Sequence, residues 1–330
     1  MNRTLTKSFL LALALLVGCE VVVLVFFARN MSGRFEYGYH PTAGVVESDD
    51  GVVNFVRAGG RRFHPQTLSA RKAEGVFRVM TVGDSVPRGP SLHDSYALQL
   101  GEHLRASGVN AESFNLAIGG FGARRSQLVL KQALRLDPSL IVLHVNNSNE
   151  FEDEREWRRM REFQSGHPKN WLMKSRALRR LHELKTEKLF WQWLPAAIRN
   201  QRAVSDADAE VRASKNDDTR REWDRLVART LAEDIALCRQ AGVPVVLVTQ
   251  ATHEPGKPLM DAELEAIARP LAGPDVLVLP MRQVLEGRKD VFSDGAHLKR
   301  EGHVVLARAL ADLLRREHLL PRAAPPAGGQ

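Results

Sequence analysis

Cysteine is scarce in this chain of 330 residues, which contains only Cys19 and Cys238. Cys19 lies in an apolar N-terminal stretch and Cys238 in a segment with helical periodicity, so we expect no intramolecular disulfide between them. No cluster of cysteine and histidine has the spacing of a zinc site, and no glycine-rich loop matches a dinucleotide or phosphate motif. The sequence therefore predicts chemistry that uses no metal and no other cofactor.

Nucleic-acid-binding signatures are also missing, although the formal net charge is +8. No helix-turn-helix, zinc-finger or RNA-binding motif accompanies the positive charge. Many of the arginines stand among acidic residues in the middle of the chain, where alternating charge is typical of a solvated helix face. We therefore expect no nucleic-acid partner, and an anionic envelope surface or glycan explains the surplus charge more economically.

The longest apolar run covers residues 9–27, which is about enough to cross a bilayer as one helix. Arg3 and Lys7 precede the run, and Glu20 interrupts it at a cost of a few kcal/mol on insertion scales. We interpret residues 1–30 as an uncleaved signal anchor, and we expect the rest of the chain outside the cytoplasm, in the periplasm or the extracellular space. The terminal position and the basic flank argue against a plain buried helix.

A bacterial lipobox is the alternative for the same segment. Leu16, Val17 and Gly18 precede Cys19 in the manner of such a motif, which would make Cys19 a lipidated mature N-terminus. The chain stays apolar from Val21 onward, where a lipoprotein normally turns polar. The membrane helix is therefore favoured, with lipid anchoring at Cys19 kept as the alternative.

Beyond a polar segment at 31–76, interpreted as a stalk with a small edge hairpin, short apolar runs alternate with helical patterns. Predicted strands cover 77–82, 112–116, 140–145, 243–249 and 276–279. Predicted helices cover 95–106, 123–135, 219–241, 261–271 and 300–316. This alternation predicts a flavodoxin-like three-layer α/β/α sandwich with a five-stranded parallel sheet over residues 77–318.

The alternation breaks at 151–218, where helices are predicted at 152–163 and 172–194. We interpret this arginine- and tryptophan-rich stretch as a helical insertion that overhangs the end of the third strand. Its tryptophans either shape an acyl or glycan pocket or pack the insertion onto the core; they are Trp157, Trp171, Trp191 and Trp193. The composition of 319–330 predicts a disordered tail.

Two short motifs offer a catalytic triad. Gly83-Asp84-Ser85 ends the first predicted strand, and Asp294 and His297 lie more than 200 residues downstream. A serine hydroxyl needs a histidine to take its proton, and that histidine needs an acceptor on its other nitrogen. Either motif alone is weak evidence, because Ser85 or Asp294 could simply cap a helix.

Two intermediate segments complete the pattern. Gly120, in the stretch 115–122, could present a backbone N–H, and Asn149, after the strand at 140–145, could present a side-chain amide. Together with the Ser85 N–H they would form a three-donor oxyanion hole.

With these four blocks in order, the chain resembles the SGNH/GDSL hydrolase superfamily of esterases, lipases and carbohydrate acetylesterases over roughly residues 78–314. The resemblance implies that Ser85 is the nucleophile and that Asp294 and His297 are its partners. It also implies that Gly120 and Asn149 are oxyanion donors. The chain departs from the family at 147–150, where Asn-Ser-Asn-Glu replaces the usual Gly-x-Asn-Asp, and at 86–89, where Val-Pro-Arg-Gly follows the serine. Both departures keep the catalytic groups and alter the pocket rim.

Three other histidines are candidate site residues. His303 is the rival base, but it falls inside a predicted helix; His144 falls inside a strand and is interpreted as a core residue; His253 follows the fourth strand and could line the pocket. His297 therefore remains the predicted base.

By this resemblance we expect a membrane-anchored serine esterase that cleaves carboxylic esters through an acyl-enzyme. The expected substrates carry short acyl or acetyl groups on an envelope glycan or lipid. An O-acyltransferase that delivers the acyl group to a polysaccharide hydroxyl is the alternative, since the first half-reaction is the same. A non-catalytic glycan-binding scaffold comes third, because Ser85, Asp294 and His297 are all present.

Overall fold

The computed structural model describes residues 3–27, 45–47, 51–55, 63–151, 153–154, 175, 177–178 and 217–321. The insertion expected at 151–218, with its two helices and four tryptophans, lies almost entirely outside these residues. The same holds for much of the expected stalk and for the tail from residue 322 onward.

Five parallel strands form the central sheet, as predicted. They are β4 (Phe77–Val82), β5 (Ala111–Asn115), β6 (Leu140–Val145), β7 (Val245–Thr249) and β8 (Val276–Pro280). Their order is β5-β4-β6-β7-β8, which is the flavodoxin-like arrangement. Every residue of β4, β6 and β7 is buried, because helices cover both faces of the sheet.

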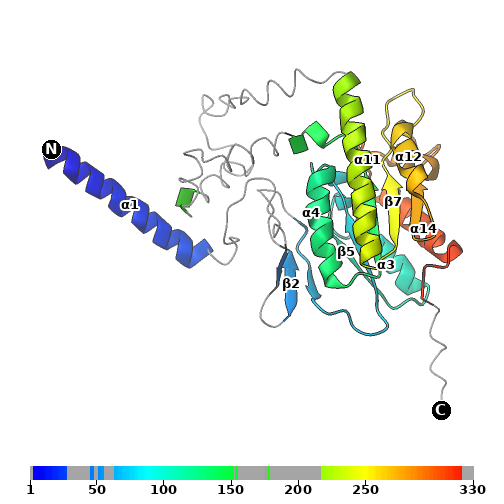
Figure 1. Cartoon of the computed structure of the whole chain (residues 1–330), viewed down its shortest axis with the longest axis horizontal. Coiled ribbons are helices and arrows are strands. Elements are labelled where there is room, and N and C mark those ends of the chain that lie inside the picture. Colours follow the sequence, from blue (N-terminus) through cyan, green and yellow to red (C-terminus); the bar gives the residue numbers. More distant parts are fainter. Residues whose placement is uncertain are drawn as a thin grey trace, which may run out of the picture.

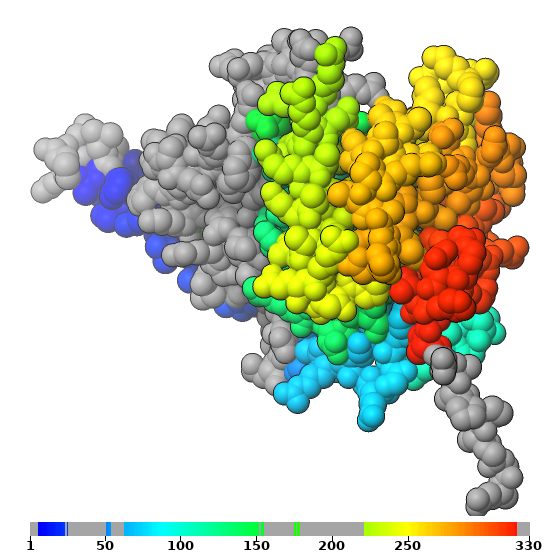
Figure 2. Space-filling view, turned by 45° about the vertical axis from the view of Figure 1, so that its right-hand side comes forward, coloured from blue at the N-terminus to red at the C-terminus, as the bar shows by residue number. Residues whose placement is uncertain are grey.

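Helices on the two faces complete the three layers (Figure 1). One face carries α4 (Ala123–Ala133), α11 (Asp217–Gln240) and α12 (Ala262–Ala268). The other carries α3 (Tyr96–Ala106), α13 (Met281–Val284) and α14 (Arg300–Arg316). Successive residues of β4 point to opposite faces of the sheet. Met80 and Val82 pack against α4, α11 and α12, and Val79 packs against α3, α13 and α14. In Figure 2, α11 and α12 lie side by side on the surface, with α14 below them.

One predicted helix is shorter than expected. The segment at 261–271 forms α12 only to Ala268 and then a 3₁₀ turn over Arg269–Leu271. Pro270 has no N–H to donate, so it cannot continue the α-helical hydrogen bonding.

Part of the segment expected as a stalk packs on the sheet. β1 (Val45–Glu47), β2 (Val52–Phe55) and β3 (Thr67–Ser69) form a small antiparallel sheet. Val53, Phe63 and Leu68 are buried in the same core as Met80. The side chain of Gln66 both accepts from Asn115 N and donates to Asn115 O, each at 2.8 Å, so it occupies the edge of β5 like an added strand residue.

The N-terminal helix α1 (Arg3–Phe27) contains the apolar window Thr6–Val23, with a mean hydropathy of 2.0. By length and composition this helix could be a membrane anchor or a signal sequence. Glu20, the acidic residue that interrupts the run, accepts hydrogen bonds from Ser175 Oγ and, at 3.2 Å, from Ala177 N.

Candidate active site

The carboxyl ends of β4, β5 and β6 meet where the strand order reverses. The chain runs from β4 outward to β5 on one side and then returns to β6 on the other. Open α/β sheets bind ligands at this point. The Ser85 motif follows β4, the Gly120 loop follows β5, and the Asn149 segment follows β6, so the topology gathers three segments that are distant in sequence.

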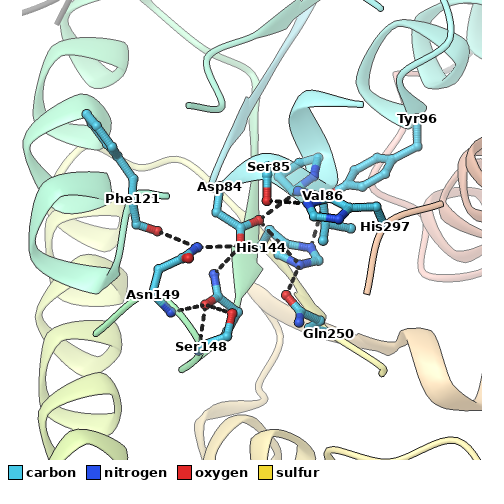
Figure 3. A network of polar contacts seen from close by, with 12 residues as sticks. Asp84, Ser85, Val86, Tyr96, Phe121, His144, Ser148, Asn149, Gln250 and His297 are labelled. Carbon is cyan, nitrogen blue, oxygen red and sulfur yellow. Dashed lines mark hydrogen bonds and ion pairs between the residues drawn. The ribbon is translucent and has the colours of Figure 1, made fainter. Parts of the chain in front are cut away.

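The Ser85 motif forms a tight turn from β4 into the short helix α2 (Ser85–Arg88). Asp84 caps this helix, because its Oδ1 accepts a hydrogen bond of 3.0 Å from Val86 N. A Cβ atom added at Gly83 would lie 2.7 Å from the Cβ of His144, so only glycine lets the turn pass there. Ser85 is therefore the first residue of α2 and lies at the carboxyl end of β4 (Figure 3).

The three residues predicted as a triad lie in hydrogen-bonding order. His297 Nε2 is 2.8 Å from Ser85 Oγ, and His297 Nδ1 is 2.8 Å from Asp294 Oδ2. The other carboxylate oxygen, Oδ1, accepts from the backbone N–H groups of Ala296 and His297, each at 2.8 Å. Oδ1 thus fixes the loop, while Oδ2 orients the imidazole ring. This is the arrangement that activates a serine hydroxyl.

These hydrogen bonds also set the charge of Asp294. Burial by itself would raise its pKa, but the backbone N–H groups of His297 and Ala296 and the ring of His297 lower the pKa below its ordinary value. Asp294 is therefore ionised at neutral pH. The Asp294 side chain is 58% exposed and the His297 side chain is 46% exposed, so both side chains are open to solvent in the part of the chain that the structure describes.

Gly120 lies in the turn that follows β5, and this turn passes beside Ser85. A Cβ atom added at the preceding Gly119 would lie 3.5 Å from Ser85 Cβ. Gly120 itself has φ +74°, a left-handed conformation that favours glycine. Its carbonyl oxygen accepts a hydrogen bond from the guanidinium of Arg125, the third residue of α4, so this helix helps to orient the turn.

Asn149 reaches the same place from the segment after β6. Its Nδ2 donates to Asp84 Oδ2 at 2.8 Å and to Phe121 O at 3.3 Å. Both amide hydrogens therefore have acceptors within the protein (Figure 3). The longer bond, to Phe121, is the one that an anionic substrate oxygen could replace.

Sequence reasoning missed the buried carboxylate that joins these parts. Asp84 is only 1% exposed, and its Oδ2 accepts from the amides of both Asn149 and Asn146, the latter at 2.7 Å. Burial raises its pKa, while the nearby His144 and the Val86 N–H oppose that rise. The sequence signal that could have revealed this contact is the polar residue Asn146, which directly follows the apolar strand β6.

The three other histidines do not contact Ser85: His303 and His144 are buried, and His253 lies against the loop of Asp294 and His297, where its backbone N–H donates to Gly295 O at 2.7 Å. His303 is buried, its Nδ1 accepts from Tyr96 N at 3.2 Å, and burial, aided by His144, lowers its pKa to about 4. His144 fits its interpretation as a core residue, since its Nδ1 is 3.2 Å from the hydroxyl of Tyr96. His253 stacks on Phe292 with ring centroids 5.6 Å apart. Only His297 among these histidines lies within hydrogen-bond distance of Ser85.

No family model and no curated protein sequence matches this chain. Among solved structures, the chain is similar to the acetyl xylan esterase AlAXEase, at 15% identity with a TM-score of 0.44, over 72% of this chain and 100% of that one. It is similar to a GDSL-like lipase from Bacteroides thetaiotaomicron, at 11% identity with a TM-score of 0.41, over 72% and 88% of the two chains. A third is AlinE4, a SGNH-hydrolase family esterase, at 14% identity with a TM-score of 0.39, over 74% and 98%. Likenesses of this size carry no argument about activity, which rests on the geometry of the site.

Proposed function

We propose that this protein is a serine esterase of the SGNH/GDSL type. The observation that carries the proposal is the pair of 2.8 Å contacts from Ser85 Oγ to His297 Nε2 and from His297 Nδ1 to Asp294 Oδ2. Three residues from the two ends of the domain meet in the order that serine catalysis requires.

In the proposed reaction, Ser85 Oγ forms a bond to the ester carbonyl carbon and its proton passes to His297 Nε2. The negative charge moves to the carbonyl oxygen, which the Ser85 and Gly120 N–H groups and the Asn149 amide are proposed to hold. Collapse of this intermediate breaks the bond to the alcohol oxygen, and His297 returns the proton to the departing alcohol. Water then repeats the sequence on the acyl-enzyme and releases the acid.

The proposed substrates are short acyl or acetyl esters on an envelope glycan or lipid, met outside the cytoplasm by a domain tethered through α1. The exposed side chains of Asp294 and His297 would let water reach the acyl-enzyme, so hydrolysis is the proposed outcome. Delivery of the acyl group to a polysaccharide hydroxyl is the second candidate, because the same open side would admit a sugar.

The test is an assay of the purified protein and its Ser85→Ala variant on p-nitrophenyl acetate, butyrate and octanoate and on acetylated glycans. Each reaction is run with and without a sugar acceptor, and both free acid and acylated sugar are measured. We expect free acid from the wild type and none from Ser85→Ala. Acylated sugar in excess of free acid would favour the transferase. A folded wild-type protein that releases no acid and does not react with a fluorophosphonate probe would refute a serine hydrolase.

A further inference from the structure

The start of α4 has an unusual cap. Gly122 occupies the N-cap position, where a serine, threonine, aspartate or asparagine side chain would normally bond the first free N–H groups. Here the acceptors come from a different segment. Asp153 accepts from Gly122 N at 2.9 Å and from Arg125 N at 3.2 Å, and Glu150 Oε1 accepts from Ala123 N at 2.7 Å.

This cap needs a glycine at its centre. A Cβ atom added at Gly122 would lie 2.6 Å from Glu150 Oε1 and 2.7 Å from Asp153 Cγ. A residue that could cap its own helix would therefore collide with the two carboxyl groups. The first turn of α4 depends on the segment after β6 for its hydrogen bonds.

A buried ion pair strengthens the same connection. Arg125 is 3% exposed and Asp153 0%, and the guanidinium Nε of Arg125 donates to Asp153 Oδ1. The Nη2 of the same guanidinium donates to Gly120 O, and its Cζ lies 4.5 Å from the centre of the Phe121 ring. Arg125 thus contacts Gly120, in the turn that passes beside Ser85, and Phe121, which follows that turn.

The other end of the ion pair leads to the second proposed oxyanion donor. Asp153 N donates to Asn149 O at 3.0 Å, so the two residues share one helical turn. The amide of Asn149 in turn donates to Phe121 O at 3.3 Å. Arg125 and Asp153 therefore link Gly120 to Asn149 by a chain of contacts that does not depend on the bond to Phe121, which a substrate oxygen could replace.

Stability alone is a poor explanation for these charges. Burying an arginine and an aspartate costs desolvation energy that their attraction only partly recovers, and apolar replacements are often as stable. The directional bonds of the guanidinium and the carboxylate instead hold two backbone segments at a set separation. Oxyanion donors must be held within about 0.5 Å of their working positions.

We propose that Arg125 and Asp153 are positioning residues that fix the Gly120 turn against the Asn149 segment and so set the geometry of the oxyanion hole. The proposal rests on the proposed esterase function. Neither residue touches the substrate; they act through the backbone of Gly120 and of Asn149.

The test is Arg125→Lys, with Arg124→Lys as the matched control. Lysine keeps the charge but cannot reproduce the planar, forked donation to Asp153 and Gly120 O. Arg124 is the neighbouring arginine, and its guanidinium donates to Glu154 at 2.8 Å. We measure kcat and KM for p-nitrophenyl acetate and express kcat per serine that a fluorophosphonate probe can label, so that a smaller fraction of folded enzyme does not lower the measured kcat.

We expect Arg125→Lys to lower kcat about tenfold, a fraction of the 10²- to 10³-fold loss that follows removal of a whole oxyanion donor, with KM within about twofold of wild type. Arg124→Lys should keep both constants within about twofold. Asp153→Asn is the second variant; it retains one carbonyl acceptor for Gly122 N, and it should lower kcat at least as much as Arg125→Lys, again with little change in KM.

Unchanged kcat per labelled serine in Arg125→Lys, with only a lower melting temperature, would assign the ion pair a purely structural role and overturn the proposal. The same holds if Arg124→Lys lowers kcat equally. A wild-type protein that neither turns over esters nor reacts with the probe would instead refute the proposed function, and this inference with it.

Discussion

Replacing Asp294 by asparagine should damage catalysis more than replacing it by alanine. In the folded protein Oδ1 accepts two backbone N–H groups and Oδ2 faces His297 Nδ1, all at 2.8 Å. An asparagine would keep its oxygen on the backbone, because an NH₂ group cannot accept those bonds. Its NH₂ would then face Nδ1, force the imidazole proton onto Nε2, and leave Ser85 Oγ without an acceptor for its proton.

The magnitude follows from the exposure of the pair. In a buried triad this change costs about 10⁴-fold in kcat, so we expect Asp294→Asn to lose about 10³- to 10⁴-fold. Alanine removes the orienting acceptor without imposing the wrong tautomer. Because the His297 side chain is 46% exposed, water can accept from Nδ1, and we expect a smaller loss of about 10²- to 10³-fold.

The assay is kcat and KM for p-nitrophenyl acetate on variants whose circular dichroism and melting temperature match the wild type. Asp290→Asn is the control, since Asp290 is an exposed aspartate of the same loop region that pairs with Arg288. It should stay within about twofold of wild type. An Asp294→Asn enzyme that retains more than about a tenth of the wild-type kcat, or that outperforms Asp294→Ala, would refute the reasoning.

Four further outcomes are expected. Ser85→Ala and His297→Ala should each lower ester turnover by several orders of magnitude in a folded protein; full activity in Ser85→Ala would end the serine mechanism. Asn149→Ala should lower kcat about a hundredfold or more with little change in KM, whereas weaker binding at constant kcat would make Asn149 a substrate-positioning group. Burial, aided by Asp153, raises the pKa of Glu150 to about 8 from an ordinary value of 4.5, so its contribution to stability is complete below pH 4.5 and is lost as the pH rises to about 8. The melting temperature measured from pH 5 to 9 should therefore fall less in Glu150→Gln than in the wild type. Melting temperatures that fall equally with pH in the two proteins would contradict this. Cys19→Ser should remain in the membrane fraction, and a fused reporter that works only outside the cytoplasm should be active; a soluble Cys19→Ser protein would favour lipid anchoring, and a silent reporter would place the domain in the cytoplasm.

Local sequence patterns determined most of the fold. β4, β6 and β7 are mostly apolar along their whole length because both of their faces are covered, and such segments stand out between helical patterns. The polar motifs at the ends of these strands could also be located, because parallel strands bring their carboxyl ends to one edge of the sheet. These signals involve residues close in sequence, so they can be recognised without knowledge of the packing.

Contacts between distant segments were decided only by the tertiary structure. Asp153 caps α4 from 31 residues away, and Gln66 covers the edge of β5 from 49 residues away. Neither has a local signature, since a carboxylate or an amide can bond many backbone groups and packing alone selects which one it meets. The same is true of the Asn149 amide: the sequence indicated a donor near Ser85, but its bonds to Asp84 and Phe121 arise from the way β5 and β6 flank β4. The kinds of groups at the site were therefore encoded locally, whereas their mutual orientation depends on the assembled sheet.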